Sequence, residues 1–259
     1  MSFFGHDAVL VDECPRETVA EGVRLERRSL LRFSAATISA TLAASCSSLG
    51  RRDTSTPRRG AAPLAEGSLD LAEFLTEMYP RAKEFIAAGG KHEEAYLMTV
   101  GALMARLEPP TPAQTVSEML KFQSSQGSTG RDFEMWVVMF DLEPGKGFNH
   151  HDHRDYNGII LGVEGETHVT SYDILGDTLV PPQGETFQIR QTRDDRILPG
   201  RFSTLGSTRE NVLELKAGPN GAVVLDAFTF LAPGANSYFM DVEPKPRDPE
   251  RRIYDAAWV

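Results

Sequence analysis

The first regular pattern of apolar and polar residues lies between residues 68 and 88. Leu71, Phe74, Leu75 and Met78 recur at the spacing of one helical face, and acidic residues lie between them. An apolar stripe with a period near 3.6 residues is typical of an amphipathic helix that packs on a core. The pattern therefore predicts a helix over residues 68–88, ended by the glycine pair that follows it.

A second helical pattern covers residues 92–107. Its predicted buried face consists of Ala95, Met98, Leu103 and Leu107. Pro109 and Pro110 follow the pattern, and proline disfavours helical conformation in the residue before it. We therefore expect this helix to end before the proline pair.

From residue 133 onward the pattern changes to short runs rich in β-branched and aromatic residues. These runs cover residues 133–142, 158–163, 167–174, 211–216 and 222–230. Turn-forming sequences separate them, as in Glu143-Pro144-Gly145, Leu175-Gly176-Asp177 and Gly218-Pro219-Asn220. Short strands with regular turn signals predict a β-sandwich or barrel, with the helices packed outside it as a cover. We expect residues 253–259 to return to the barrel edge as a last strand.

The composition narrows the possible partners. The chain has 259 residues, 37 acidic and 27 basic, and a formal net charge of −10. A surface that binds nucleic acid needs an excess of basic residues. Nucleic acid is therefore not expected as a partner. Only two cysteines are present, Cys14 and Cys46, so no disulfide framework supports the fold.

The N-terminal residues have the layout of an export signal. Arg27 and Arg28 precede a short, weakly apolar stretch that ends at Cys46. This order resembles a twin-arginine signal followed by a lipoprotein cleavage box. It implies export to the periplasm, with possible membrane attachment through a lipid on Cys46. The alternative is that this stretch is an amphipathic helix of the folded domain with a chance arginine pair.

These patterns divide the chain into four parts. Residues 1–45 are the predicted export signal, and residues 46–67, rich in Arg, Ser, Thr, Pro and Gly, are a flexible tether. Residues 68–125 form the helical segment, and residues 126–259 form the barrel. We expect a monomer.

Three of the six histidines, His150, His151 and His153, lie in one stretch of four residues. The sequence around them is Phe148-Asn149-His150-His151-Asp152-His153. In a β-strand, successive side chains point to opposite faces. His151 and His153 would therefore converge on one point, with His150 and Asp152 on the other face. Neutral imidazoles bind Fe, Zn, Cu and Ni. A solvated polar loop is the alternative interpretation of these residues.

The surrounding block resembles the thiol dioxygenases of the cupin superfamily: the plant cysteine oxidases, cysteamine dioxygenase and, more distantly, cysteine dioxygenase. In that block a His-Asp-His sequence is followed twelve positions later by a turn glycine and then by a strand ending in Ser-Tyr-Asp. Here these are His151 to His153, Gly165 and the strand that ends at Asp173. The match covers about 25 residues well and residues 133–230 more loosely. It implies a cupin barrel, a mainly β double-stranded β-helix.

The resemblance also implies a chemistry. His151 and His153 would be two ligands of a non-haem Fe(II) ion, which would oxidise a thiol with O₂ to a sulfinic acid. The substrate would be cysteine, cysteamine or an N-terminal cysteine. Asp226, in a Leu-Asp pair that the family shares, would belong to the catalytic site. The family's tyrosine six residues later is replaced by Ala232, and Tyr238 is the candidate substitute.

The third metal ligand of the family is missing, because the chain has no histidine after His168. Counting back from Asp226 places the missing residue at Glu214 or Leu213. An inward Glu214 would complete a site of two histidines and one carboxylate, which also suits Fe(II). An inward Leu213 would leave only two protein ligands.

Two further functions therefore stay open. The barrel could have lost catalysis and serve as an envelope module that binds a small ligand. It could also use Zn, Ni or Mn in hydrolytic or isomerase chemistry. We expect the position of the Glu214 carboxylate relative to the two imidazoles to separate these possibilities.

Overall fold

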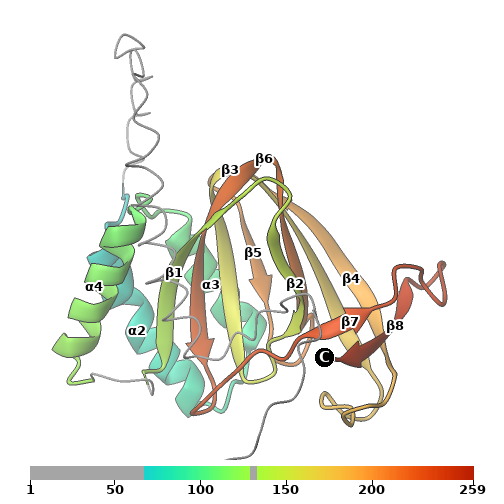
Figure 1. Cartoon of the computed structure of the whole chain (residues 1–259). Coiled ribbons are helices and arrows are strands. Elements are labelled where there is room, and N and C mark those ends of the chain that lie inside the picture. The colour runs from blue at the N-terminus through green and yellow to red at the C-terminus, as the bar shows by residue number, and fades with distance from the viewer. Residues whose placement is uncertain (1–66, 129–132) are drawn as a thin grey trace, which may run out of the picture.

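The computed structural model describes residues 67–128 and 133–259 (Figure 1). The helices in this part of the chain are α2 (Leu71–Ala87), α3 (Glu93–Met104) and α4 (Pro112–Ser125). The strands are β1 (Met135–Leu142), β2 (Gly147–Asp152), β3 (Tyr156–Leu175), β4 (Phe187–Ile197), β5 (Phe202–Leu205), β6 (Val212–Phe230), β7 (Met240–Val242) and β8 (Ile253–Trp258). The helices therefore precede all the strands, as the sequence pattern predicts.

Helix α2 confirms the first predicted helix. Asp70 begins it with a capping box, in which its side chain accepts a hydrogen bond from the Glu73 amide and the Glu73 carboxylate accepts one from the Asp70 amide. Phe74, Leu75 and Met78 are fully buried. The apolar stripe that predicts the helix is the face that packs on the rest of the protein.

Helix α3 confirms the second predicted helix but presents a different face. Ala95 and Met98, predicted to be buried, are exposed, and Tyr96, Leu97 and Val100 are buried instead. The helix is apolar nearly all round, so its sequence does not define one buried stripe. The sheet beneath it determines which side is covered, because the Tyr96 hydroxyl shares a 2.5 Å hydrogen bond with Thr229 of β6.

The strands form one antiparallel sheet in the order β1-β6-β3-β4-β8-β7, with β2 paired to β6 and β5 paired to β3. Strands β3 and β6 run side by side over most of their length and form the centre of the sheet (Figure 1). Each contains two of the predicted strands. The chain does not break into separate strands at the predicted glycine turns. Each long strand continues through its turn sequence, and the register of β3 with β6 shifts on both sides of Gly165.

The central strands bury both of their faces. One face packs with the helices in a core that includes Phe74, Val100, Leu225 and Ala227. The other face lines the inside of the curled sheet with Val224, Phe228 and other apolar residues. The helices lie on the side of β1 and β3, and β4, β7 and β8 lie at the other end (Figure 1). The structure thus confirms the predicted fold class, a mainly β protein with an N-terminal helical cover, consistent with a cupin barrel.

The predicted export signal, Arg27, Arg28 and Cys46, and nearly all of the tether lie outside the described residues. Among the helices of the described part, none is long and apolar enough to cross a membrane.

Candidate functional site

Strand β2 carries the histidines and contains a β-bulge. Phe148 pairs with Leu215, and His151 pairs with Leu213, so three steps along β2 match two steps along β6. The extra residue places Phe148 and His151 on the same inner face. At the start of β2 only glycine fits, because a Cβ at Gly147 would lie 1.9 Å from the Leu215 carbonyl oxygen.

The two predicted imidazoles lie side by side in the buried interior. The Nε2 atoms of His151 and His153 are 3.3 Å apart, and the ring centroids are 5.1 Å apart. His151 is 4% exposed and His153 is 1% exposed. The convergence predicted from strand alternation is confirmed, and the alternative of a solvated loop does not fit this burial.

Burial keeps both rings neutral. It lowers the pKa of His151 to about 4 and the pKa of His153 well below its usual value. The His151 Nδ1 atom lies 2.7 Å from the Asn149 carbonyl oxygen, which can only accept a hydrogen bond. The proton of His151 is therefore on Nδ1, and its Nε2 lone pair accepts the 3.3 Å hydrogen bond that the Nε2–H of His153 donates. A metal ion between the rings would replace this shared proton, and for His151 the Nδ1-protonated form is the one that a metal-ligating histidine needs.

The imidazole pair fits two ligands of one metal ion. Nitrogen ligands lie about 2.0–2.1 Å from a bound transition metal, so two Nε2 atoms 3.3 Å apart would subtend an angle of about 105° at a shared ion. A complete site of three protein ligands does not fit. Within residues 67–128 and 133–259, no three His, Cys, Asp or Glu side chains lie close enough together to hold a metal ion.

Glu214 is not brought to the imidazole pair. Its carboxylate accepts a 3.0 Å hydrogen bond from Lys216 and lies 3.9 Å from Nε2 of His150, on the opposite face of the strand. The residue opposite His151 is Leu213, which is buried. Directly paired residues of antiparallel strands share a face. Of the two positions considered for a third ligand, the one that faces His151 is therefore apolar, and the predicted ligand set of two histidines and Glu214 is not assembled.

Asp226 faces the interior, as its position between Val224 and Phe228 requires. It is 5% exposed, and its Oδ1 atom has no hydrogen-bond partner among the described residues. Desolvation raises its pKa well above the usual value, which favours the protonated form of the side chain. A Cβ at Gly158 would lie 3.3 Å from this oxygen. Asp226 is therefore a buried polar group with one oxygen left without a partner among the described residues.

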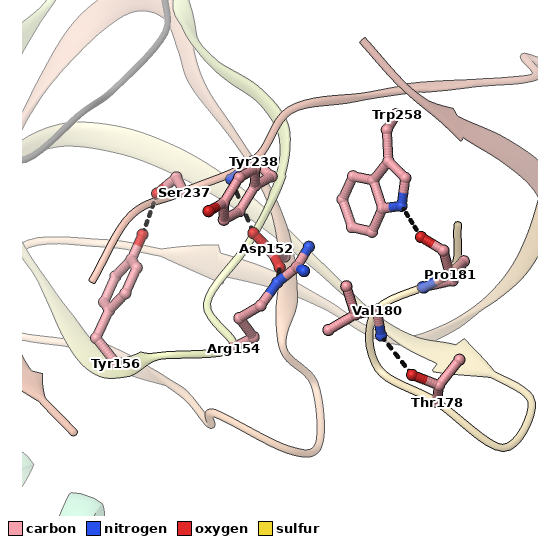
Figure 2. Close-up of polar contacts among 9 residues, drawn as sticks. All are labelled: Asp152, Arg154, Tyr156, Thr178, Val180, Pro181, Ser237, Tyr238 and Trp258. Carbon is pink, nitrogen blue, oxygen red and sulfur yellow. Dashed lines mark hydrogen bonds and ion pairs between the residues drawn. The ribbon is translucent and has the colours of Figure 1, made fainter. Parts of the chain in front are cut away.

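Tyr238, the second predicted catalytic residue, lies on the outer side of the histidine segment. It is 43% exposed, and its ring packs under the guanidinium of Arg154. A different tyrosine lies beside the imidazoles. The Tyr156 ring is 4.3 Å from that of His153, and its hydroxyl hydrogen-bonds to Ser237 (Figure 2). Sequence reasoning missed Tyr156, although its place three residues after His153 was a usable signal.

Further unpaired polar atoms face the same interior. The Nδ1 atom of His153 and the Oγ atom of Ser171 are buried and have no hydrogen-bond partner in the described part of the chain. Ser171 lies opposite Leu213 on β3, so its hydroxyl shares the inner face with His151. Buried polar groups are normally satisfied. This set of orphaned atoms marks a place for water or for the polar atoms of a ligand.

No known protein family and no curated protein matches this chain. Among solved structures, it is similar to recombinant oxalate oxidase in complex with glycolate, with 17% identity over 41% of this chain and 46% of that chain and a TM-score of 0.28. It is also similar to KdgF from Halomonas sp., with 17% identity over 39% of this chain and 73% of that chain and a TM-score of 0.27. The 11S globulin from Wrightia tinctoria is 14% identical over 41% of this chain and 23% of that chain, with a TM-score of 0.30.

The chain thus spans less than half of the oxalate oxidase and globulin chains. With identities and TM-scores this low, these likenesses carry no argument about activity, ligand or partner.

Proposed function

We propose that the barrel interior binds a small molecule at His151 and His153, with a transition-metal ion held between the two imidazoles. The observation that carries this proposal is the pair of buried, neutral rings whose Nε2 atoms are 3.3 Å apart. Neutral imidazoles are common ligands of transition-metal ions. With two protein ligands, the remaining coordination positions belong to water and to the bound molecule.

The other inner residues have separate roles in this proposal. The Asp226 side chain, whose raised pKa favours the protonated form, donates a hydrogen bond to the bound molecule, and the Ser171 hydroxyl donates or accepts one. The Tyr156 ring holds His153 in place from the side. A bound metal ion would polarise a coordinated group and lower the pKa of a coordinated thiol.

The finer proposal is an iron-dependent oxygenase that converts a thiol to a sulfinic acid with O₂. Its support is the sequence resemblance around His151, His153 and Asp226 and the presence of the first two residues as an imidazole pair. Leu213 in the third position separates the chain from the family's complete site. Oxygenase activity therefore requires iron binding by only two protein side chains.

A ligand-binding module without catalysis is the second candidate. The apolar Leu213 position and the unpaired Oδ1 atom of Asp226 favour it, because both suit a molecule held by burial and hydrogen bonds. This candidate needs neither iron nor O₂.

Metal content and oxygen uptake separate the iron-dependent oxygenase from the ligand-binding module without catalysis. The full chain would be purified anaerobically, its bound metal measured by mass spectrometry, and Co²⁺ binding followed by calorimetry. Oxygen consumption would then be measured with cysteine, cysteamine and an N-terminal cysteine peptide. His151→Ala and His153→Ala are the test variants. His168→Ala is the control, because His168 is exposed and hydrogen-bonds only to Glu166 among the described residues.

Metal binding that is lost in both test variants and kept in the control supports the metal site. Thiol-dependent oxygen uptake with the same pattern supports the oxygenase. A wild-type protein that stays metal-free after reconstitution refutes both the metal site and the oxygenase. The ligand-binding module is then the remaining candidate.

A further inference from the structure

A second cluster of side chains contacts the histidine segment and joins it to the C-terminal strand β8. We call Asp152, Arg154, Tyr238 and Trp258 the Arg154 clamp (Figure 2). The guanidinium carbon of Arg154 lies 4.5 Å from the centroid of the Tyr238 ring and 4.7 Å from that of Trp258. A guanidinium this close to two aromatic ring centroids is held by cation–π attraction to both rings.

The edge of the guanidinium is fixed as well. The Arg154 Nε atom donates to Asp152 Oδ2, in an ion pair in which the Asp152 side chain is 0% exposed and that of Arg154 is 12% exposed. The other carboxylate oxygen of Asp152 accepts a 2.8 Å hydrogen bond from the Tyr238 amide. The Asp152 amide donates in return to the Tyr238 carbonyl oxygen at 3.1 Å. Asp152 is thus held to the backbone of Tyr238 by two hydrogen bonds, one through its side chain and one through its own amide.

The clamp reaches both histidines through the residues on either side of Tyr238. Ser237 hydrogen-bonds to Tyr156, whose ring packs on His153 at 4.3 Å. Phe239 packs on the His151 ring at 5.3 Å. Asp152 itself lies between the two histidines in sequence. A change at Arg154 would therefore move the backbone that carries both rings and the side chains that support them.

The end of the chain completes the clamp. The Trp258 indole donates a 2.9 Å hydrogen bond to the Pro181 carbonyl oxygen (Figure 2). This bond holds in place the Trp258 ring that contacts Arg154. Segments that are far apart in sequence thus meet behind the histidine segment.

We infer that Arg154 is a positioning residue that sets the separation of the His151 and His153 imidazoles through Asp152 and Tyr238. This inference rests on the proposed metal site, since the separation matters most for a shared ion. Removing one partner of a buried ion pair leaves the other charge unpaired and lowers stability, and groups that orient metal ligands strongly affect metal affinity. Loss of Arg154 is therefore expected to lower both stability and metal affinity, and the test has to separate the two effects.

The test compares Arg154→Gln, Arg154→Lys and a matched control, Arg193→Gln. Arg193 also forms partly buried ion pairs, with Asp195 and Glu210 on another part of the sheet. We expect Arg154→Gln to weaken Co²⁺ binding about 10- to 100-fold. The Arg154→Lys variant keeps the charge and should recover part of the affinity. The control should bind Co²⁺ like the wild type.

A second measurement uses the metal-free protein and separates positioning from a loss of stability. The imidazole ¹⁵N signals report the tautomers of His151 and His153, and they are recorded well below the unfolding temperature of each variant. We expect Arg154→Gln to shift or broaden both sets of signals and the control to leave them unchanged. An Arg154→Gln variant that unfolds earlier but keeps wild-type imidazole signals and Co²⁺ affinity would overturn the inference.

The two proposals fail in different ways. If the wild type does not bind Co²⁺, the proposed metal site is wrong. The imidazole signals of the metal-free variants then still decide whether Arg154 positions the two rings.

Discussion

Leu213 and Glu214 are neighbours in sequence whose side chains lie on opposite faces of β6. The pairing of Leu213 with His151 turns the leucine inward and leaves Glu214 beside His150 and Lys216. A strand alternates with a period of two, so a shift of one residue in register would have exchanged their roles. The identity of the third residue at the imidazole pair therefore depends on one step of register.

Leu213→His should complete the site. A third imidazole on the face of His151 would add a metal ligand, and we expect Co²⁺ to bind at least about tenfold more tightly, or about 1.4 kcal/mol. Glu214→His is the matched control, because it places the same group one residue away on the opposite face. Equal Co²⁺ affinities of the two variants by calorimetry would contradict the assigned register.

Asp226→Asn should stabilise the protein near neutral pH. The raised pKa of the buried Asp226 means that the folded state binds its proton more tightly than the unfolded state does. The stability that this proton contributes is fully present below the unfolded pKa and is lost as the pH rises through the folded pKa. Asparagine cannot ionise and so avoids this loss.

The advantage of the Asn variant should shrink as the pH falls toward 4. Thermal unfolding of both proteins between pH 4 and 8 measures it. A difference in melting temperature that does not change with pH would show that Asp226 does not titrate as a buried acid.

At the scale of elements, the long strands β3 and β6 depend on glycines at their irregular points. Gly165 has a φ of +70°, and a Cβ there would lie 2.3 Å from the carbonyl oxygen of Gly221 in the partner strand. A side chain at this position is opposed both by its own backbone conformation and by the neighbouring strand. Backbone approach at this point lets the two strands stay paired through the bulge.

Gly165→Ala should lower the free energy of unfolding by about 2–4 kcal/mol, because the left-handed conformation and the contact with Gly221 add together. Gly145→Ala tests the conformational part alone. Gly145 has a φ of +69° and nothing within 4 Å of its added Cβ, so we expect a loss of only about 1–2 kcal/mol. Urea unfolding measures both, and equal losses would mean that the Gly221 contact contributes nothing.

The helices are joined to the sheet by polar contacts as well as by the apolar core. Tyr96 of α3 and Thr229 of β6 share a buried hydrogen bond of 2.5 Å. Tyr96→Phe would leave the Thr229 hydroxyl unpaired, and we expect a loss of about 1–3 kcal/mol in urea unfolding. Tyr79→Phe is the control, because the bond from Tyr79 to Glu134 is longer, at 3.4 Å, and partly exposed. A larger loss in the control would contradict this ranking.

At the scale of the whole molecule, the helical layer and the two long strands place the histidine segment on the inner side of the curled sheet. The helices cover one face of the central strands, and the imidazole pair and Asp226 lie on the other face. The C-terminal strand β8 contacts the same segment through Trp258, whose ring packs against Arg154. Elements from both ends of the described chain therefore contribute to one small site.

For the full chain we propose export by the twin-arginine route, with a lipid on Cys46 and a monomeric mature protein. Replacing Arg27 and Arg28 together by lysine should keep the protein in the cytoplasm, and Cys46→Ser should release it from the membrane fraction. Cell fractionation measures both. Export of the double lysine variant at the wild-type level would contradict the proposed route.

The sequence alone predicted the features that depend on local order. The apolar stripe over residues 68–88 predicts α2, because a helix repeats every 3.6 residues. The alternation around Asp152 predicts that His151 and His153 share a face, because a strand repeats every two. The change of pattern at residue 133 predicts a mainly β fold behind a helical cover.

Only the tertiary structure decided features that depend on how distant segments pair. The bulge in β2 and its register with β6 turned Leu213 inward, and the sheet under α3 selected Tyr96 rather than Ala95 and Met98 as the buried side. The packing of the C-terminal segment turned Tyr238 outward against Arg154. Register, the choice of buried face and the contacts of a terminal strand are set by long-range packing, and no short stretch of sequence contains them.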